Sequence, residues 1–390
     1  MLAPPYDVIT TEQRHALYGR NMRNIVRIDS GEDYPHDVAG VNDRYTRAAS
    51  FLASWLDLDI LVREAAPCVY VCDHEFMHPD GRRLHRRGVF VTVPARPWQD
   101  SMLRPHERTL LEPKRDRLEL MRVTRMQTSP VFAVWSGAES LAEHLAGVAT
   151  GEALLGGRID GELDAEKLLL WRVDAEPVLR LILDALEAAT LYVADGHHRY
   201  ETSVEFGASN CLVYLGSAGD PALIILPTHR LVRPAADVAF SLDDLWARLD
   251  DRYEVEPAGD VDSALAQAGA TRATHHGFAV VAGDGVAVLR RPREPAEVGR
   301  AALDVSVRES EVLAPAGMGP EAIAAGALGF TRDTAELAAA VAAGDAVLGF
   351  AVLPVSAAEV IAVADAGETM PQKSTYFYPK VPTGLVLYPV

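Results

Sequence analysis

The sequence predicts a two-domain α+β protein, with a mixed-sheet domain over residues 1–233 and a smaller α+β domain over residues 234–390. Strand-like and helix-like segments alternate along the chain without an internal repeat, a pattern typical of sheets covered by helices. After Arg233 the composition becomes rich in Ala, Val, Gly and Asp, which indicates a domain boundary. Residues 370–380 combine lysines, hydroxyls and aromatic rings that a solvated tail would not need, so we expect this last segment to return to the functional site.

The elements of the first domain follow from their hydrophobic patterns. Residues 44–58 carry an apolar stripe at helical spacing, and residues 177–188 form a second amphipathic helix. Pro79-Asp80-Gly81 separates two strand-like runs and predicts a β-hairpin. The strands expected here are residues 24–28, 69–76, 87–93, 131–135, 168–173, 191–194, 211–215 and 222–226.

The second domain has few charged or aromatic clusters before its last segment. Its patterns predict helices at residues 242–249, 261–268 and 334–343. The strands expected here are residues 277–281, 285–289 and 347–353.

Composition restricts the classes of function. An apolar fraction of 49% in 390 residues can build more than one core, and a net charge of −18 disfavours binding to nucleic acid or to anionic membranes. The 3 cysteines provide no disulfide framework and no CxxC metal pair. No signal peptide is recognisable, and no apolar run reaches the roughly 20 residues of a membrane-spanning helix. We therefore expect a cytoplasmic protein that binds a small molecule, and a homo-oligomer is compatible with the sequence.

The segment richest in reactive side chains is Asp195-Gly196-His197-His198-Arg199. It follows a buried apolar run and precedes a helix-like stretch, so it is predicted to be the turn from a strand into a helix. The first turn of a helix presents unpaired N–H groups and the positive end of its dipole, which together attract anions. Histidine and arginine add donors for phosphate or carboxylate. The segment therefore predicts a site for one of these anions.

Two other interpretations of this segment were weighed. Asp195 could simply cap the helix, with surface histidines behind it. A zinc site is less natural, because adjacent histidines at the start of a helix point about 100° apart, unlike the i, i+4 pair of HExxH. A Mg²⁺ ion carried with phosphate is more compatible with these residues.

A second polar cluster runs from Arg104 to Arg117. His106 and Glu107 suggest HExxH, but its last position is Leu110, so a zincin site is excluded. An ordinary charged helix with i, i+4 pairs is the structural alternative. In the functional interpretation Glu107 is a base or metal ligand, and Arg104, His106 and Arg108 bind an anion.

Two further motifs lie towards the C-terminal half. Thr228-His229-Arg230 follows an apolar strand just as Asp195 does, and it is either a polar strand end or part of the same sheet edge. Lys373-Ser374-Thr375 lacks the GxxxxG of a P-loop, yet its ammonium and hydroxyl groups, with Tyr376, suit a phosphate. Phe377 is expected in a core strand.

These motifs together resemble a known family. In order along the chain they are Tyr6-Asp7-Val8-Ile9, His106-Glu107-Arg108-Thr109, Asp195-Gly196-His197-His198-Arg199-Tyr200, Pro227-Thr228-His229-Arg230 and the run from Lys373 to Lys380. The chain resembles prokaryotic domain-of-unknown-function family one-thousand-fifteen over nearly its whole length. A weaker likeness, over about residues 191–206, is to the ParB and sulfiredoxin superfamily. That likeness implies a ParB/sulfiredoxin-like core in the first domain and a turn that cradles nucleotide phosphates.

Some members of that superfamily are free-serine kinases, and a pyrophosphate-dependent serine kinase is known in bacteria. The resemblance therefore implies transfer of a phosphoryl group from pyrophosphate or a nucleotide to a small hydroxylated substrate such as L-serine. Phosphoryl transfer needs cations around the transferring group and a carboxylate that accepts a proton. His197, His198, Arg199, Arg230 and Lys373 supply cations, while Asp195 and Glu107 divide the roles of base and Mg²⁺ ligand in an order that stays open.

Two alternatives remain at this point. A ParB-like nucleotide-binding regulator would change shape on binding without metabolic turnover. A phosphoester hydrolase would use the same cations with water as the acceptor. In each case Asp195–Arg199 is expected to form one wall of a pocket completed by residues near Arg104, Arg230 and Lys373.

Overall fold

The computed structural model describes the whole chain except residues 1, 108–110, 234–241 and 251. Two compact units are present, and each is described separately. The first consists of Met1–Pro105, Thr109–Ile224 and Phe377–Val390, and the second of His106–Arg108 and Ile225–Tyr376. No helix in the described part of the chain has the length and apolar character needed to cross a membrane.

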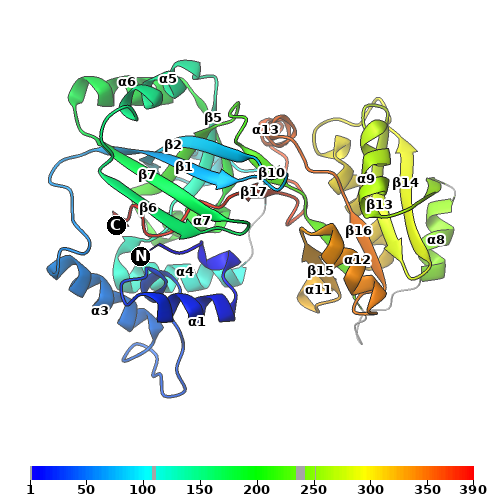
Figure 1. The fold of residues 1–390 in the computed structure, drawn as a ribbon, viewed down its shortest axis with the longest axis horizontal. Coiled ribbons are helices and arrows are strands. Elements are labelled where there is room, and N and C mark those ends of the chain that lie inside the picture. The colour runs from blue at the N-terminus through cyan, green and yellow to red at the C-terminus, as the bar shows by residue number, and fades with distance from the viewer. Residues whose placement is uncertain (1, 108–110, 234–241, 251) are drawn as a thin grey trace. The chain divides into compact units, whose positions relative to one another are not determined.

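The first unit contains the mixed eight-stranded sheet that the sequence predicts (Figure 1). Its parallel pairs are β3 with β8 and β5 with β9, and the remaining neighbours are antiparallel. The predicted hairpin is β1 and β2, which pair from Tyr70 with Phe90 to Met77 with Arg83. In spatial order the strands are β3 (Leu103–Arg104), β8 (Thr190–Asp195), β5 (Val131–Ser136), β9 (Asn210–Ser217), β2 (Arg83–Pro94), β1 (Val69–Met77), β7 (Ala165–Val173) and β6 (Leu155–Asp160).

Helices cover the two faces of this sheet (Figure 1). On one face α5 (Glu139–Val148) and α6 (Glu176–Glu187) pack Leu141 and Ile182 against alternate strand residues. The N-terminal helices have a separate core that includes Leu52 and Trp55. The helices that contribute to this N-terminal core are α1 (Thr11–Arg20), α2 (Val26–Asp29), α3 (Arg44–Asp57) and α4 (Leu111–Thr124). Helix α7 (His197–Phe206) packs Tyr200 into the same core as α5 and α6.

The strand expected at residues 24–28 is wrong, because this segment leads into helix α2. The side chain of Asn24 accepts a hydrogen bond from Val26 N at 3.0 Å and so begins the helical turn. Ile25, Val26 and Ile28 are buried in the N-terminal core. A short apolar run without polar alternation is equally compatible with a buried strand and a buried helix.

The second unit contains a six-stranded sheet with antiparallel pairing. Helices α9 (Val261–Ala270) and α12 (Thr334–Ala342) pack Ala264 and Leu337 into its core. The strands in spatial order are β12 (Glu254–Ala258), β14 (Gly285–Pro292), β13 (His275–Ala282), β16 (Leu348–Ala351), β11 (His229–Val232) and β15 (Leu328–Thr331). Because β11 pairs only within this sheet among the described strands, the unit begins at Ile225, before the expected boundary at residue 233.

The C-terminal segment lies in the first unit rather than ending the second. Strand β18 (Tyr388–Pro389) pairs with β4 (Met126–Gln127), and Thr383 N donates to Ala3 O at 2.9 Å. The last segment belongs to the first unit from Phe377 onward, and this part includes Lys380. Its expected return to the functional site stays a prediction.

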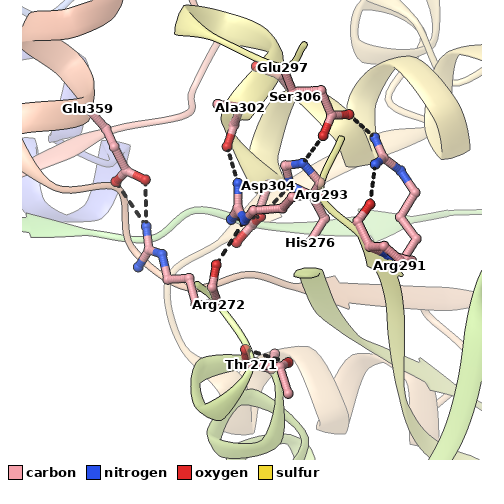
Figure 2. Close-up of polar contacts among 12 residues, drawn as sticks. Thr271, Arg272, His276, Arg291, Arg293, Glu297, Ala302, Asp304, Ser306 and Glu359 are labelled. Atoms are coloured by element: carbon pink, nitrogen blue, oxygen red, sulfur yellow. Dashed lines mark hydrogen bonds and ion pairs between the residues drawn. The ribbon is translucent and has the colours of Figure 1, made fainter. Parts of the chain in front are cut away.

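A buried ionic network fixes the helical segment after β14 to the second sheet (Figure 2). His276 lies between two carboxylates, with Nδ1 2.7 Å from Asp304 Oδ1 and Nε2 3.0 Å from Glu297 Oε2. Arg293 donates to Asp304 at 2.9 Å, and Arg291 donates to Glu297 at 2.5 Å. These contacts hold α10 (Asp304–Val307) and the turn that follows it in place.

Candidate functional site

The segment from Asp195 to Arg199 forms the predicted strand-to-helix turn. β8 ends at Asp195, and Gly196 adopts φ 92° before α7 begins at His197. A Cβ atom at Gly196 would lie 3.0 Å from Cζ of Arg199, so glycine is required both by the positive φ and by the close side chain. The turn therefore places three cationic or ionisable side chains on the first turn of a helix, at the positive end of its dipole.

Asp195 lies between two cations of the first unit. Its Oδ2 accepts from Arg199 Nη2 at 2.6 Å, and its Oδ1 accepts from Lys380 Nζ at 2.6 Å. Burial alone would raise the pKa of Asp195, but the charges of Lys380 and Arg199 hold that pKa well below its usual range. Asp195 is therefore a carboxylate at neutral pH that orients two cations.

The loop before β3 contacts the first turns of α7 through Arg96 and Trp98. The hydroxyl of Tyr200 donates to Arg96 O at 2.8 Å and accepts from Arg96 N at 3.2 Å, and Trp98 stacks on Tyr200 with a centroid distance of 4.3 Å. Trp98 also lies 6.3 Å from the ring of His197 and donates to Glu201 at 2.8 Å. These contacts hold the start of α7 in place, where His197 is buried and His198 is half-buried.

Lys380 is the functional candidate that the sequence interpretation missed in this unit. It belongs to the same aromatic motif as Lys373, but the P-loop-like tripeptide drew attention to Lys373 instead. The segment before Lys380 is anchored by buried Arg86, which donates to Tyr378 O at 3.3 Å and to Pro379 O at 2.8 Å. The only signal in the sequence was the clustering of polar and aromatic residues up to residue 380.

Most of the other predicted site residues lie together in the second unit. His106 Nε2 is 3.2 Å from Thr375 Oγ1, and Glu107 Oε1 accepts from Lys373 N at 3.3 Å. Met370 N donates to His106 O at 2.8 Å. The segments around residues 106 and 373, far apart in sequence, therefore form one polar cluster.

Arg230 is the central cation of this cluster. Nη2 donates to Gln372 O at 2.8 Å, and Nη1 donates to Lys373 O and to Thr228 O, each at 3.1 Å. The buried Ser374 hydroxyl donates to Pro371 O at 2.6 Å. Arg230 and Ser374 thus shape the loop that carries Lys373, whose side chain is exposed.

Two neighbouring groups complete the second cluster. His229 is buried, and burial with the charges of Arg308 and Arg230 lowers its pKa to about 4, so it is neutral at pH 7. Tyr376 packs under Arg332, whose Cζ lies 3.9 Å from the ring centroid. His229, predicted to bind phosphate or substrate, is therefore a neutral group at pH 7.

Arg308 is a second residue that sequence reasoning missed. It is fully buried, and within the described part of the chain none of its three guanidinium nitrogens has a hydrogen-bond partner. Glu309 provides only an ion pair at 3.8 Å. Burial lowers the pKa of Arg308 to about 10, yet the group stays charged at neutral pH. Its charged neighbours in the sequence indicate a surface helix and give no signal of this position.

The predicted residues thus fall into two groups, one in each unit. The first unit holds Asp195, Gly196, His197, His198, Arg199 and Arg104, the last of which is exposed on β3 beside β8. The second unit holds His106, Glu107, Thr228, His229, Arg230, Lys373, Ser374, Thr375 and Tyr376. Arg108, also expected to bind an anion, lies outside the described residues.

The residues expected to bind Mg²⁺ do not fit a protein-held ion. Across the described residues, no group of three His, Cys, Asp or Glu side chains has the arrangement of a metal site. Both oxygens of Asp195 already contact cations at 2.6 Å, which would repel a divalent ion. We therefore derive no step through a metal bound by Asp195 or Glu107.

Comparison with known proteins places the chain in a family. No curated protein matches the sequence. A free serine kinase in complex with AMP has 13% identity and a TM-score of 0.42, over 76% of this chain and 92% of that one. SbnI with a C-terminal truncation, from Staphylococcus aureus, has 12% identity and a TM-score of 0.41, over 75% and 85% of the two chains. The family model described as "Protein of unknown function (DUF1015)" matches residues 1–306, and the chain belongs to this family.

Proposed function

We propose that the protein is a phosphotransferase. It moves a phosphoryl group from pyrophosphate or a nucleotide to the hydroxyl of a small substrate, with L-serine, which gives O-phosphoserine, as the first candidate. The observation that carries the proposal is the position of Asp195 between Arg199 and Lys380 at the first turn of α7. This arrangement places fixed cations at the positive end of the helix dipole.

A phosphate suits this place for electrostatic reasons. The positive end of a helix dipole attracts anions, and α7 begins directly after a glycine turn. Asp195 holds Arg199 and Lys380 in fixed orientations, so little reorganisation is needed when charge develops on the transferring group. Gly196, His197 and His198 contribute donors of the same turn.

The two proposed catalytic carboxylates differ in role. Because its pKa is depressed, Asp195 is a poor proton acceptor near pH 7 and acts as a positioning group. We therefore propose Glu107 as the base that accepts the hydroxyl proton. One of its oxygens already accepts a backbone hydrogen bond from Lys373, which fixes the carboxylate.

In the second unit Lys373 and Arg230 are the proposed phosphate-binding cations. Arg308 adds a buried positive charge beside Arg230 and His229, as its effect on the pKa of each of them indicates. The supporting residues proposed for substrate or phosphate binding are His106, Thr228, His229, Ser374, Thr375 and Tyr376, together with Arg104 of the first unit.

The reaction balances without a further reactant. The bond between the terminal phosphorus and its bridging oxygen breaks, and a bond forms from the same phosphorus to the hydroxyl oxygen of the acceptor. The electron pair of the broken bond leaves with phosphate when pyrophosphate is the donor, with the nucleoside diphosphate when ATP is, and with the nucleoside monophosphate when ADP is. The hydroxyl proton passes to the carboxylate of Glu107.

The test supplies purified protein with L-serine, Mg²⁺ and either pyrophosphate, ATP or ADP, and measures O-phosphoserine by ³¹P NMR. We expect one donor to give product. Asp195→Asn and Glu107→Gln should each lower turnover at least about 100-fold, the range of a lost electrostatic or acid–base contribution. Asp184→Asn, an exposed carboxylate of α6, is the matched control and should keep full activity.

The alternatives predict different results in the same assay. Equal phosphate release with and without serine would identify a hydrolase. Nucleotide binding without product from any donor would favour a regulator. Full activity of both Asp195→Asn and Glu107→Gln would overturn the assignment of the site.

A further inference from the structure

A small polar cavity lies in the first unit, between α2, α3 and α4. Its volume is about 100 Å³, and its lining includes Tyr6, Asp29, Arg44, Tyr45, Asp116 and Arg117. An engineered cavity of about 150 Å³ accepts benzene, so the size suits a ligand with roughly five to seven non-hydrogen atoms. None of the predicted site residues lines this cavity.

The charges of the lining are balanced. Two carboxylates, Asp29 and Asp116, face two guanidinium groups, Arg44 and Arg117. Asp116 is fully engaged, because Oδ1 accepts from Arg44 Nη2 at 2.7 Å and Oδ2 accepts from Arg117 Nε at 2.8 Å. A balanced lining favours a ligand that carries both signs of charge over a simple anion or cation.

Asp29 supplies an acceptor for such a ligand. It is 2% exposed, and its Oδ1 accepts from Thr128 Oγ1 at 2.6 Å, from Ser129 Oγ at 3.1 Å and from Arg117 Nη1 at 3.2 Å. Its Oδ2 is buried and, over the described ranges, has no hydrogen-bond partner. A buried carboxylate oxygen without a donor is unfavourable, and an ammonium group would satisfy it.

Arg44 supplies the opposite charge. Its side chain is 29% exposed, and Nη1 donates to Asp33 Oδ2 at 3.1 Å. Asp33 is itself 65% exposed, and ion pairs at such positions contribute little to stability. A ligand carboxylate can therefore replace Asp33 at the guanidinium of Arg44.

A second, smaller cavity of about 30 Å³ shares Asp29 and Arg117 with the first and is also lined by Arg199. Arg199 is the residue that pairs with Asp195 in the turn before α7. Asp29 and Arg117 are therefore common to the polar cavity and to a smaller cavity that Arg199 also lines.

We propose that this cavity binds a small α-amino acid, with the ammonium group on Asp29 and the carboxylate on Arg44. This assignment deepens the proposed phosphotransferase, since it names the acceptor class and its binding residues, and for the choice of L-serine it rests on that function. The amino-acid site itself follows from the cavity.

The test measures binding to the full chain by calorimetry without any phosphoryl donor. L-serine and L-alanine should bind, whereas ethanolamine, which lacks the carboxylate, and L-lactate, which lacks the ammonium group, should bind at least about tenfold more weakly. Equal binding of all four compounds, or no binding of either amino acid, would overturn the proposal.

Variants of the cavity residues test whether serine binds in this cavity. Arg44→Gln and Asp29→Asn should each weaken serine binding by about tenfold or more. Arg47→Gln is the matched control, because Arg47 lies on the same helix and pairs with Asp37 outside the cavity lining. Arg44→Gln needs no change in the core, so the test stands even if Asp29→Asn does not fold.

The two proposals can fail separately. Serine binding that depends on Arg44, without phosphoryl transfer, would support the cavity and reject the kinase. Phosphoryl transfer with an unchanged KM for serine in Arg44→Gln would support the kinase and reject the cavity.

Discussion

Nζ of Lys380 lies 2.6 Å from Oδ1 of Asp195, although the two residues are 185 positions apart in the sequence. The contact brings the C-terminal segment to the first turn of α7 and opposes Arg199 across the same carboxylate. Because all three side chains are largely buried, each depends on the others for a favourable charge environment. The C-terminal segment is therefore part of the candidate site.

Replacing Lys380 with methionine tests this dependence. Asp195 would keep only one of its two cations, and breaking a buried ion pair typically costs about 3–5 kcal/mol. We expect Lys380→Met to lower the free energy of unfolding by about 3 kcal/mol in urea titrations followed by circular dichroism. Lys380→Arg, which keeps the charge, should lose less than about 1 kcal/mol.

Lys373→Met is the second control for that experiment. Lys373 belongs to the same motif, but its side chain is exposed, so the change should be within about 0.5 kcal/mol. A loss at Lys380 no larger than the loss at Lys373 would show that the pair with Asp195 does not stabilise the protein.

The lowered pKa of His229 leads us to expect that the stability of the second unit depends on pH. Its folded pKa of about 4 lies below the ordinary value of about 6.5, so between these values the unfolded chain binds a proton that the folded chain does not. The contribution of neutral His229 to stability is therefore complete above about pH 6.5 and is lost as the pH falls towards 4. Over this window the wild type should lose about 3 kcal/mol more than His229→Gln.

Urea unfolding at several pH values between 4 and 7.5 measures the difference. His275→Gln, a half-buried histidine of the same unit, should keep the wild-type dependence. Identical pH profiles for the wild type and His229→Gln would mean that His229 titrates normally in the folded protein.

Part of this site could be predicted from the sequence because it is local. The turn at Gly196 needs only an apolar strand, a glycine and a helix, and each of these has a sequence signal. The contact of Lys380 with Asp195 and the burial of Arg308 depend on tertiary packing, and no local pattern encodes them. The strand expected at residues 24–28 failed for a related reason, since burial on all sides removes the alternation that distinguishes strand from helix.

The position of the domain boundary likewise depends on tertiary pairing that local sequence signals do not encode. The composition changes after Arg233, but the sheet of the second unit already includes β11, which starts at His229. Pairing partners decide where a unit begins, and β15 and β16 lie about a hundred residues later in the chain. A single sequence contains no direct record of that pairing.

Arg308 and Arg291 form a matched pair of buried arginines in the second unit. Arg291 donates to Glu311 at 2.8 and 3.0 Å and to Pro292 O at 2.9 Å. Among the residues that the structure describes, Arg308 has only the ion pair with Glu309 at 3.8 Å. Arg291→Met should destabilise the protein by about 3 kcal/mol, because it leaves carboxylates without their partner. Arg308→Met should be neutral or stabilising by about 1 kcal/mol, because it removes a poorly paired buried charge. Equal losses in chemical unfolding would indicate that the native protein provides Arg308 with an anionic partner.

Gly196 and Gly207 lie at the two ends of α7. A comparison of their alanine variants distinguishes backbone strain from a steric effect on the site. Their φ angles are 92° and 81°, so alanine is strained at both positions and should cost about 1 kcal/mol at Gly207. A Cβ at Gly207 meets no atom within 4 Å among the described neighbours, whereas at Gly196 it would lie 3.0 Å from both Cζ and Nε of Arg199.

We expect Gly196→Ala to cost about 1–2 kcal/mol more than Gly207→Ala, because the displaced guanidinium weakens its pair with Asp195. Phosphoryl transfer should fall only in Gly196→Ala, measured as O-phosphoserine formed by each folded variant. Equal stability and equal activity of the two variants would show that the geometry of Arg199 and Asp195 matters neither to the fold nor to the reaction.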